Sequence, residues 1–424
     1  MASPYQFPLS RDEFRRALKQ GLGRALEFVK AYGLEGYQDL FLAACLKNQV
    51  FDAQCEQDRS EWLSLFIDDA PEWLTDPLYL KLCQLNPEEE ESWGQWTKLA
   101  LLLARRGAGE ARQALYRGFR ILDDGELVSA REIIELDGAK GLIWISEQLE
   151  KAAQLERSTF LGLLDFFDET HGEGTGAQAV RASKNPRLQG FLRRLDRPEP
   201  KWKHEGTPDK IPLSALEAVT KLDAYHLSRW LKSAAPEEGE ILVRELGRSR
   251  DPDHLEKILF CFMNSGLPRY DPILLKLAEY PYGDVARRAR WVLANHEHPD
   301  VRAKALEWLN SGLLGDGRLR AIRSVLTPAD IATIEEAVAS TLHRLGDDEV
   351  HDLLSDTLHL AERHDLPEVA QLLRLCYEFS PCTQCRRESI NLLILRKLLP
   401  RWMARECRWD SSDSIRELVA LNSP

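Results

Sequence analysis

Apolar residues recur at helical spacing along much of the chain. The clearest case spans residues 284–310, where two similar segments begin sixteen residues apart, at Asp284 and Asp300. Each segment places apolar side chains at the same four offsets, which lie on one face of a helix with 3.6 residues per turn. The eight positions are Val285, Ala289, Val292, Leu293, Val301, Ala305, Trp308 and Leu309. The pattern predicts two successive amphipathic helices.

Capping residues mark where helices begin. Ser10 and Glu13 have the spacing of a capping box, in which each side chain bonds the backbone N–H of the other residue. Elsewhere a cap residue is followed by proline, which is tolerated at the first helical position because its missing N–H would be unpaired there anyway. The pairs are Asp76-Pro77, Asn86-Pro87, Asp251-Pro252, Asp271-Pro272 and Thr327-Pro328. They predict many short helices with tight turns between them.

A helical hairpin is predicted around the short turn Gly107-Ala108-Gly109, because apolar stripes at three-to-four spacing flank this turn on both sides. Strand signals are scarce. The sequence shows no sustained alternation of apolar and polar residues, and no Asn-Gly or Asp-Gly turn between β-branched runs. We therefore expect an all-α protein.

The segment from Asp300 to Ala305 reads Asp-Val-Arg-x-x-Ala. It resembles the signature of HEAT repeats, in which an acidic cap precedes an apolar residue and an arginine. Asp413-Ser414-Ile415-Arg416 resembles the same signature more weakly. This resemblance to HEAT and armadillo proteins implies an irregular α-solenoid of stacked antiparallel helix pairs. HEAT pairs recur about every 40 residues, a period that the sequence does not establish over the whole chain.

A Gly- and Pro-rich stretch interrupts the helical pattern. It runs from residue 171 to residue 212 and begins with the closely spaced Gly172, Gly174 and Gly176, after which five prolines occur. Such composition is typical of a linker or a long surface loop. We therefore predict a helical block over residues 10–170, a basic linker with one helix near Leu188–Leu195, and a HEAT-like block over 213–424.

Charge is unevenly distributed along the 424 residues, whose net charge is −12. Residues 51–96 contain twelve Asp or Glu and two Lys or Arg. This acidic segment could face a basic partner and steer its approach. The alternative is a solvated surface, in which the run Glu88–Glu91 is stabilised by the positive end of a helix that begins after Asn86.

Basic residues gather in two other places. The linker carries eight Lys or Arg between residues 181 and 203, with Trp202 among them, so it could lie on a phosphate backbone and stack on a base, or dock on the acidic segment of its own chain. Arginines of the C-terminal half could line a basic groove like that of HEAT-like DNA glycosylases, a fold-level analogy. These arginines are Arg287, Arg288, Arg302, Arg386, Arg387, Arg401 and Arg405.

Four of the eight cysteines fall within 32 positions: Cys376, Cys382, Cys385 and Cys407. Cys-x-x-Cys is a usual half of a tetrahedral zinc site, so these four thiols are candidate zinc ligands, although Cys376 and Cys407 would have to converge through the fold. A Cys-x-x-Cys at a helix N-terminus can also be redox-active. Buried structural thiols are the third interpretation.

The sequence contains no catalytic motif of the kinds that carry hydrolase, kinase or zinc-protease chemistry. The cysteines do not form a secreted disulfide framework, and no signal peptide or membrane span is evident. We therefore expect a cytoplasmic, non-enzymatic scaffold that binds a protein partner along a solenoid surface, without membrane association. The alternative is a nucleic-acid-binding HEAT-like protein that uses the basic groove. The oligomeric state stays open.

Overall fold

The computed structural model describes residues 5–195 and 214–422, except for residue 54, residue 124 and residues 152–156. This part of the chain is mostly helical, with α-helices α1 to α26, two short 3-10 helices and two very short strands. The expected all-α class is confirmed. No helix among the described residues is long and apolar enough to cross a membrane.

The chain forms two compact units, each of which is considered by itself. Unit 1 takes residues 1–205 and 405–416, and unit 2 takes residues 206–404 and 417–424. The boundary between residues 205 and 206 falls within the predicted linker, whereas residues 405–416 of the predicted C-terminal block 213–424 belong to unit 1. The segment 171–212 also contains two helices, α11 (Thr175–Arg181) and α12 (Pro186–Leu195), because Pro186 can occupy the first helical position. Residues 196–212 of this segment, which include Trp202, lie outside the described residues.

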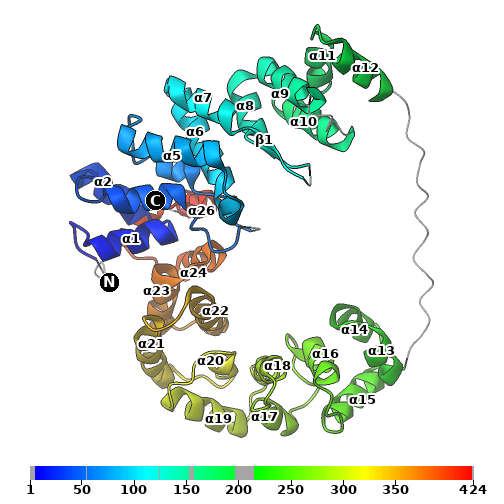
Figure 1. Cartoon of the computed structure of the whole chain (residues 1–424). Coiled ribbons are helices and arrows are strands. Elements are labelled where there is room, and N and C mark those ends of the chain that lie inside the picture. The colour runs from blue at the N-terminus through cyan, green and yellow to red at the C-terminus, as the bar shows by residue number, and fades with distance from the viewer. Residues whose placement is uncertain (1–4, 54, 124, 152–156, 196–213, 423–424) are drawn as a thin grey trace. The chain divides into compact units, whose positions relative to one another are not determined.

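Helices of unit 1 pack in alternation. α1 contacts α3, α3 contacts α5 and α5 contacts α7, while α4, α6, α8 and α10 form a second series (Figure 1). The elements besides α11 and α12 are α1 (Arg11–Gln20), α2 (Gly23–Tyr32), α3 (Gln38–Leu46), α4 (Ser60–Ser64), α5 (Glu72–Gln84), η1 (Pro87–Ser92), α6 (Trp93–Arg105), α7 (Gly109–Gly118), α8 (Ala130–Asp137), α9 (Ala139–Lys151) and α10 (Arg157–His171).

Several predicted helix boundaries are confirmed. The Ser10–Glu13 capping box opens α1, and the hairpin across residues 107–109 is α6 followed by α7. The start predicted at Asp76 is wrong, because Pro77 lies inside α5, which begins at Glu72. The proline removes one intrahelical hydrogen bond there, and the burial of Leu74 and Leu78 keeps the helix packed on both sides of it.

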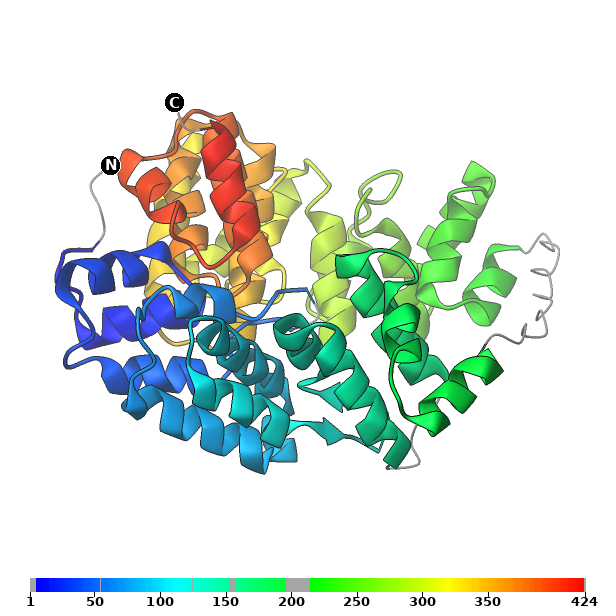
Figure 2. The ribbon, with the colours of Figure 1, turned by 90° about the horizontal axis from the view of Figure 1, so that it is seen from above.

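A small hairpin joins α7 to α8. Its strands β1 (Arg120–Ile121) and β2 (Leu127–Val128) pair antiparallel and are visible as two short arrows in Figure 2. Ser129 follows β2 with φ of 65°, a left-handed conformation that is uncommon for a residue other than glycine. With two residues each, the strands are too short to give an alternating signal in the sequence.

The segment 405–416 completes the core of unit 1. Arg24 on α2 and Glu406 form a buried ion pair, with Nε–Oε1 and Nη2–Oε2 distances of 2.7 and 2.9 Å. The indole N–H of Trp62 donates to the carbonyl of Trp409 over 2.7 Å. Gly23 packs against the backbone of Glu406 so closely that a Cβ atom would lie 2.0 Å from its carbonyl oxygen.

Unit 2 repeats the alternating arrangement more regularly. Each even-numbered helix from α14 to α22 packs on the next even-numbered helix, and Figure 1 places these helices along one side of the unit with the odd-numbered helices on the other. The elements are α13 (Ala215–Lys221), α14 (Ala224–Leu231), α15 (Pro236–Leu246), α16 (Pro252–Phe262), α17 (Ile273–Leu277), α18 (Gly283–Leu293), α19 (Pro299–Asn310), α20 (Arg318–Ala321), α21 (Pro328–Leu342), α22 (Asp347–Arg363), η2 (Pro367–Val369), α23 (Ala370–Phe379) and α24 (Thr383–Leu395). Two further helices, α25 (Arg401–Cys407) and α26 (Asp413–Asn422), fall at the division between the units.

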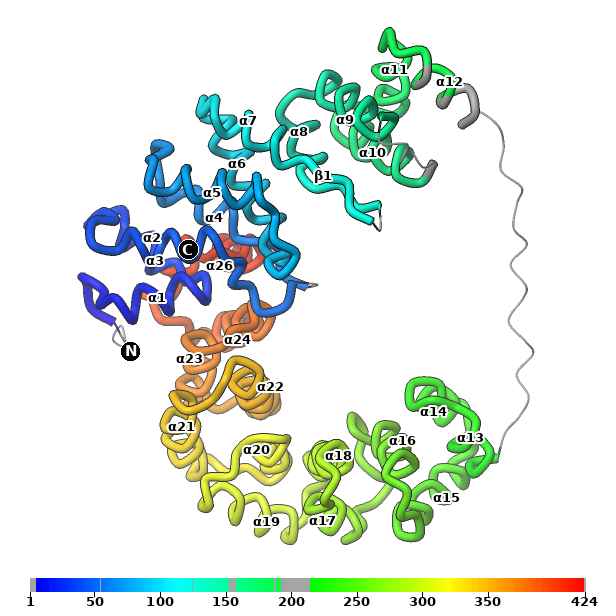
Figure 3. The backbone as a smooth tube through the Cα atoms, in the orientation of Figure 1, coloured from blue at the N-terminus to red at the C-terminus, as the bar shows by residue number. Residues whose placement is uncertain are grey.

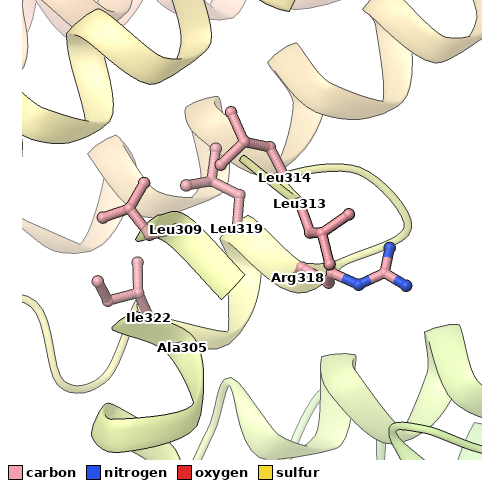
Figure 4. Close-up of a pocket in the computed structure, with 7 residues that line it drawn as sticks. All are labelled: Ala305, Leu309, Leu313, Leu314, Arg318, Leu319 and Ile322. Carbon is pink, nitrogen blue, oxygen red and sulfur yellow. The ribbon is translucent and has the colours of Figure 1, made fainter. Parts of the chain in front are cut away.

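The two amphipathic helices predicted over residues 284–310 are α18 and α19. All eight apolar positions of the predicted faces are buried. A shallow hollow between α19 and α20 is lined by leucines, and Arg318 lies at its edge (Figure 4). It has no room for a molecule the size of water, so we regard it as a packing feature.

Candidate metal centre

Two neighbouring even-numbered helices bring a histidine and two cysteines together. α22 carries His351, and α24 begins directly after Cys382, with Cys385 in its first turn. The helices pack side by side in unit 2 (Figure 3). His351 lies near the N-terminal end of α22, and Cys382 caps the N-terminal end of α24. The stacking therefore places side chains more than thirty residues apart in one cluster.

The three side chains have the spacing of a metal site. One ligand atom from each of His351, Cys382 and Cys385 lies within 4.8 Å of the other two. The Nδ1 atom of His351 is 3.9 Å from the Sγ atom of Cys385. A tetrahedral ion bound at about 2.3 Å to sulfur and about 2.0 Å to nitrogen holds such atoms about 3.5–3.8 Å apart. A shift of about 1 Å or less would therefore bring the cluster to zinc geometry.

Hydrogen bonds among the three side chains shift their pKa values in different directions. The pKa of Cys382 is lowered, chiefly by the hydrogen bond from Cys385 and then by that from His351. The pKa of Cys385 is raised by the same contact with Cys382 and by burial. The hydrogen bond with Cys382 raises the pKa of His351. The cluster thus favours a thiolate at Cys382, and thiolate is the form in which cysteine binds metal or attacks a disulfide.

The other two predicted zinc ligands lie elsewhere. Cys376 is fully buried on α23, where its thiol donates to the carbonyl of Leu354 over 3.5 Å, and burial raises its pKa. It lies near Cys385 but outside the three-residue group. Cys407 is buried in unit 1. Of the four predicted thiols, the structure therefore brings Cys382 and Cys385 together with a histidine.

Arginines proposed for the basic groove hold carboxylates of their own unit. Arg288 binds Glu256 over 2.7 Å. Arg302 makes two hydrogen bonds to the carboxylate of Asp330, of 2.9 and 3.0 Å. Each of these pairs joins residues about thirty positions apart. These ion pairs connect helices of neighbouring pairs. A structural role therefore explains the presence of both arginines without an external partner.

The remaining predicted arginines differ in exposure. Arg287 pairs with Asp284 over 2.7 Å and Arg405 pairs with Glu27 over 3.2 Å. Arg386 is fully buried in α24, so its guanidinium is not accessible to an external partner. The exposed members of the set include Arg387 and Arg401.

His351 is the residue that motif reasoning missed. It lies 31 positions before Cys382, a separation set by the length of one helix pair rather than by a local motif. The signal that could have identified His351 was the repetition of helix pairs. If consecutive helices of one layer run parallel, residues near their N-terminal ends become neighbours, so a histidine one repeat before a Cys-x-x-Cys is a candidate ligand.

Comparisons of this chain with protein-family models, with curated proteins and with solved structures find no match.

Proposed function

We propose that this chain is a non-enzymatic protein-interaction scaffold and that unit 2 is a HEAT-like α-solenoid. The packing of each even-numbered helix from α14 to α22 on the next is the observation that carries this proposal. Stacked helix pairs bury a continuous core in this way and leave one face of each layer exposed along the stack. The Asp300–Ala305 segment, which carries the HEAT-like pattern, spans the first turns of α19 within that stack.

The partner that fits is a protein with a basic surface. Residues 51–96 of unit 1 are strongly acidic, and most of their carboxylates are exposed. Complementary charge steers association and selects against acidic partners. The exposed acidic residues include Asp58, Glu61, Asp68, Asp69, Glu72, Asp76, Glu88, Glu90 and Glu91.

A zinc ion bound by His351, Cys382 and Cys385 would join α22 to α24 and so stabilise two successive layers of the solenoid. Sites of this kind contribute directly to folding stability. With three protein ligands, a water molecule would complete the tetrahedron. A Cys382–Cys385 dithiol that cycles to a disulfide is the competing use of these thiols, and the nearby imidazole of His351 favours metal.

Affinity purification from the native cell tests the scaffold, with each preparation divided and treated with or without nuclease. We expect a stoichiometric protein partner that survives nuclease treatment. The double variant Asp68→Lys/Glu72→Lys should lose this partner, whereas Glu336→Lys/Glu368→Lys, which reverses two carboxylates of unit 2, should retain it. Retention of the partner by the first variant would show that the acidic segment is not the binding surface.

Nucleic acid is the competing partner in the same experiment. Co-elution of nucleic acid, with proteins lost on digestion, would contradict the scaffold and support the basic groove. Binding that weakens steeply between about 50 and 200 mM salt would be its signature.

A further inference from the structure

Unit 1 contains a pocket of about 470 Å³ between η1, α6, the β1–β2 hairpin, α8 and α10. Pockets of about 300–1,000 Å³ are typical of small-molecule sites. Its wall combines aromatic and aliphatic side chains with carboxylates. Trp93, Leu163 and Phe166 contribute apolar surface, while Glu90 and Glu132 are among its acidic residues.

Two helical glycines keep the pocket open. Gly162 lies inside α10, where glycine costs about 1 kcal/mol relative to alanine. A Cβ atom at Gly162 or Gly94 would meet no atom within 4 Å. Packing against the rest of the fold therefore does not require glycine at either position. Both residues line the pocket, so the space in front of them belongs to it.

Charge in the pocket favours a cation. Three carboxylates line it, from Glu90, Glu126 and Glu132, against the single guanidinium of Arg131. That guanidinium already lies over the ring of Phe166, 5.3 Å from its centroid. Burial raises the pKa of Glu132, and the hydrogen bond with Thr97 and the charge of Lys98 give its ionised form only partial compensation. A cationic ligand would complete that compensation.

Two buried polar atoms on side chains of the pocket wall also lack partners. Within the described residues, Trp93 Nε1 and Ser129 Oγ have no hydrogen-bond partner. Both residues are more than nine-tenths buried, and an unpaired buried polar group costs about 1–3 kcal/mol. An oxygen of the ligand would be a suitable acceptor for the indole N–H, with a small side-chain adjustment.

We propose that this pocket binds a small organic amine whose apolar body carries a hydroxyl or carbonyl oxygen. The ammonium group lies among the carboxylates, and the apolar body lies against Phe166 and Leu163. The pocket shares Glu90 with the acidic segment of the scaffold proposal, but its ligand does not depend on that proposal or on the cluster in unit 2.

Three probes of similar shape and different charge test this proposal on the full chain: tyramine, the neutral 4-ethylphenol and the anionic 4-hydroxyphenylacetate. Ligand-observed NMR titration up to about 10 mM covers the weak binding expected of fragments. We expect tyramine to bind at least about tenfold more tightly than the other two probes, a difference of about 1.4 kcal/mol. Absence of tyramine binding, or equal binding of all three probes, would overturn the proposal.

Variants locate the site. Gly162→Leu fills the pocket while improving helix propensity, so we expect it to lower tyramine affinity at least about tenfold without lowering the melting temperature. Glu132→Gln should lower the affinity for tyramine about fivefold. Gly283→Leu, at an exposed helical glycine of unit 2 with open space before its Cβ, is the matched control and should leave binding unchanged. Undiminished binding by Gly162→Leu would refute this location.

Discussion

The Nδ1 atom of His351 lies 3.9 Å from the Sγ atom of Cys385, although the two residues are 34 positions apart in the chain. Their proximity depends on the packing of α22 against α24. The cluster is a candidate metal site, and its geometry depends on the packing of two successive layers of unit 2.

The first prediction concerns metal content. Protein purified without chelator should contain about one zinc ion per chain, and His351→Ala and Cys382→Ser should each abolish this stoichiometry, because two remaining ligands hold zinc weakly. Inductively coupled plasma mass spectrometry measures the content. Removal of the metal with a chelator should lower the melting temperature of the wild-type protein and leave that of Cys382→Ser unchanged.

Two cysteine variants serve as controls. Cys376→Ala and Cys407→Ala remove buried thiols outside the His351–Cys382–Cys385 group, so both should retain zinc. Loss of zinc in either would restore that thiol to the ligand set predicted from the sequence. A preparation with no zinc that forms a Cys382–Cys385 disulfide under mild oxidation would instead establish the redox interpretation.

The second prediction concerns the buried ion pair of unit 1. Glu406 is fully buried and Arg24 is 2% exposed. Replacing Glu406 with Gln removes the carboxylate that Arg24 binds in the core and should lower the free energy of unfolding by about 3–5 kcal/mol. The double variant Arg24→Met/Glu406→Leu should lose less than this, because it removes both charges. Urea denaturation monitored by circular dichroism would measure both.

An exposed pair is the comparison for this measurement. Arg11 and Asp39 form an ion pair on the surface of the same unit, where solvent screens the interaction. Arg11→Ala should change stability little. A comparable loss in Arg11→Ala and Glu406→Gln would show that burial does not set the strength of the Arg24–Glu406 pair.

The third prediction concerns the pH dependence of unit 2. Burial raises the pKa of Asp356 on α22 to about 7, partly offset by the charge of Arg320. The unfolded chain ionises this group near pH 4 while the folded chain still holds the proton, so stability should fall as pH rises from about 4 to about 7. The loss should reach a few kcal/mol.

Asp356→Asn isolates this contribution, because asparagine cannot ionise. Its free energy of unfolding should therefore change less than that of the wild type between pH 4 and pH 8, and the two curves should diverge as pH rises. Denaturation series at several pH values would provide the curves. Parallel curves would show that Asp356 ionises normally in the folded protein.

The fourth prediction concerns the close approach at Gly23. A methyl group there would overlap the carbonyl oxygen of Glu406, so Gly23→Ala should destabilise unit 1 despite the higher helix propensity of alanine. Gly109→Ala, at the first residue of α7 with open space before its Cβ, should be neutral or stabilising. Thermal unfolding followed by tryptophan fluorescence would compare them. Equal melting temperatures for the two variants would contradict this contact.

The local part of the fold was predictable from the sequence. The faces of α18 and α19 were predicted position by position, because an amphipathic helix needs no knowledge of its partner to reveal which side is buried. Capping at Ser10 and Thr327 is equally local, since donor and acceptor are three residues apart. The start predicted at Asp76-Pro77 was wrong because a packed helix can also hold a proline in its interior, as α5 does, and sequence alone does not distinguish the two positions.

The candidate site was predictable only in part, because one of its three residues is brought in by tertiary packing rather than by local sequence. Cys382 and Cys385 are linked by a short spacing, whereas His351 reaches them through the packing of two helices. The arginines show the same limit. Arg288 and Arg302 were visible as charges, but their partners Glu256 and Asp330 lie on other helices. The sequence therefore identified which residues carry charge, whereas tertiary packing determined which of them already form ion pairs within the protein.

The contribution of residues 405–416 to unit 1 has a consequence for synthesis. A ribosome must make the whole of residues 206–404 before it makes the segment that holds Glu406 and Trp409. During that interval the buried side of α2 and the indole of Trp62 lack their final partners. Unit 1 therefore cannot be completed until residues 405–416 have been made, and nascent chains of this protein would depend on protection of that surface, by a chaperone or by delayed folding, until this segment emerges.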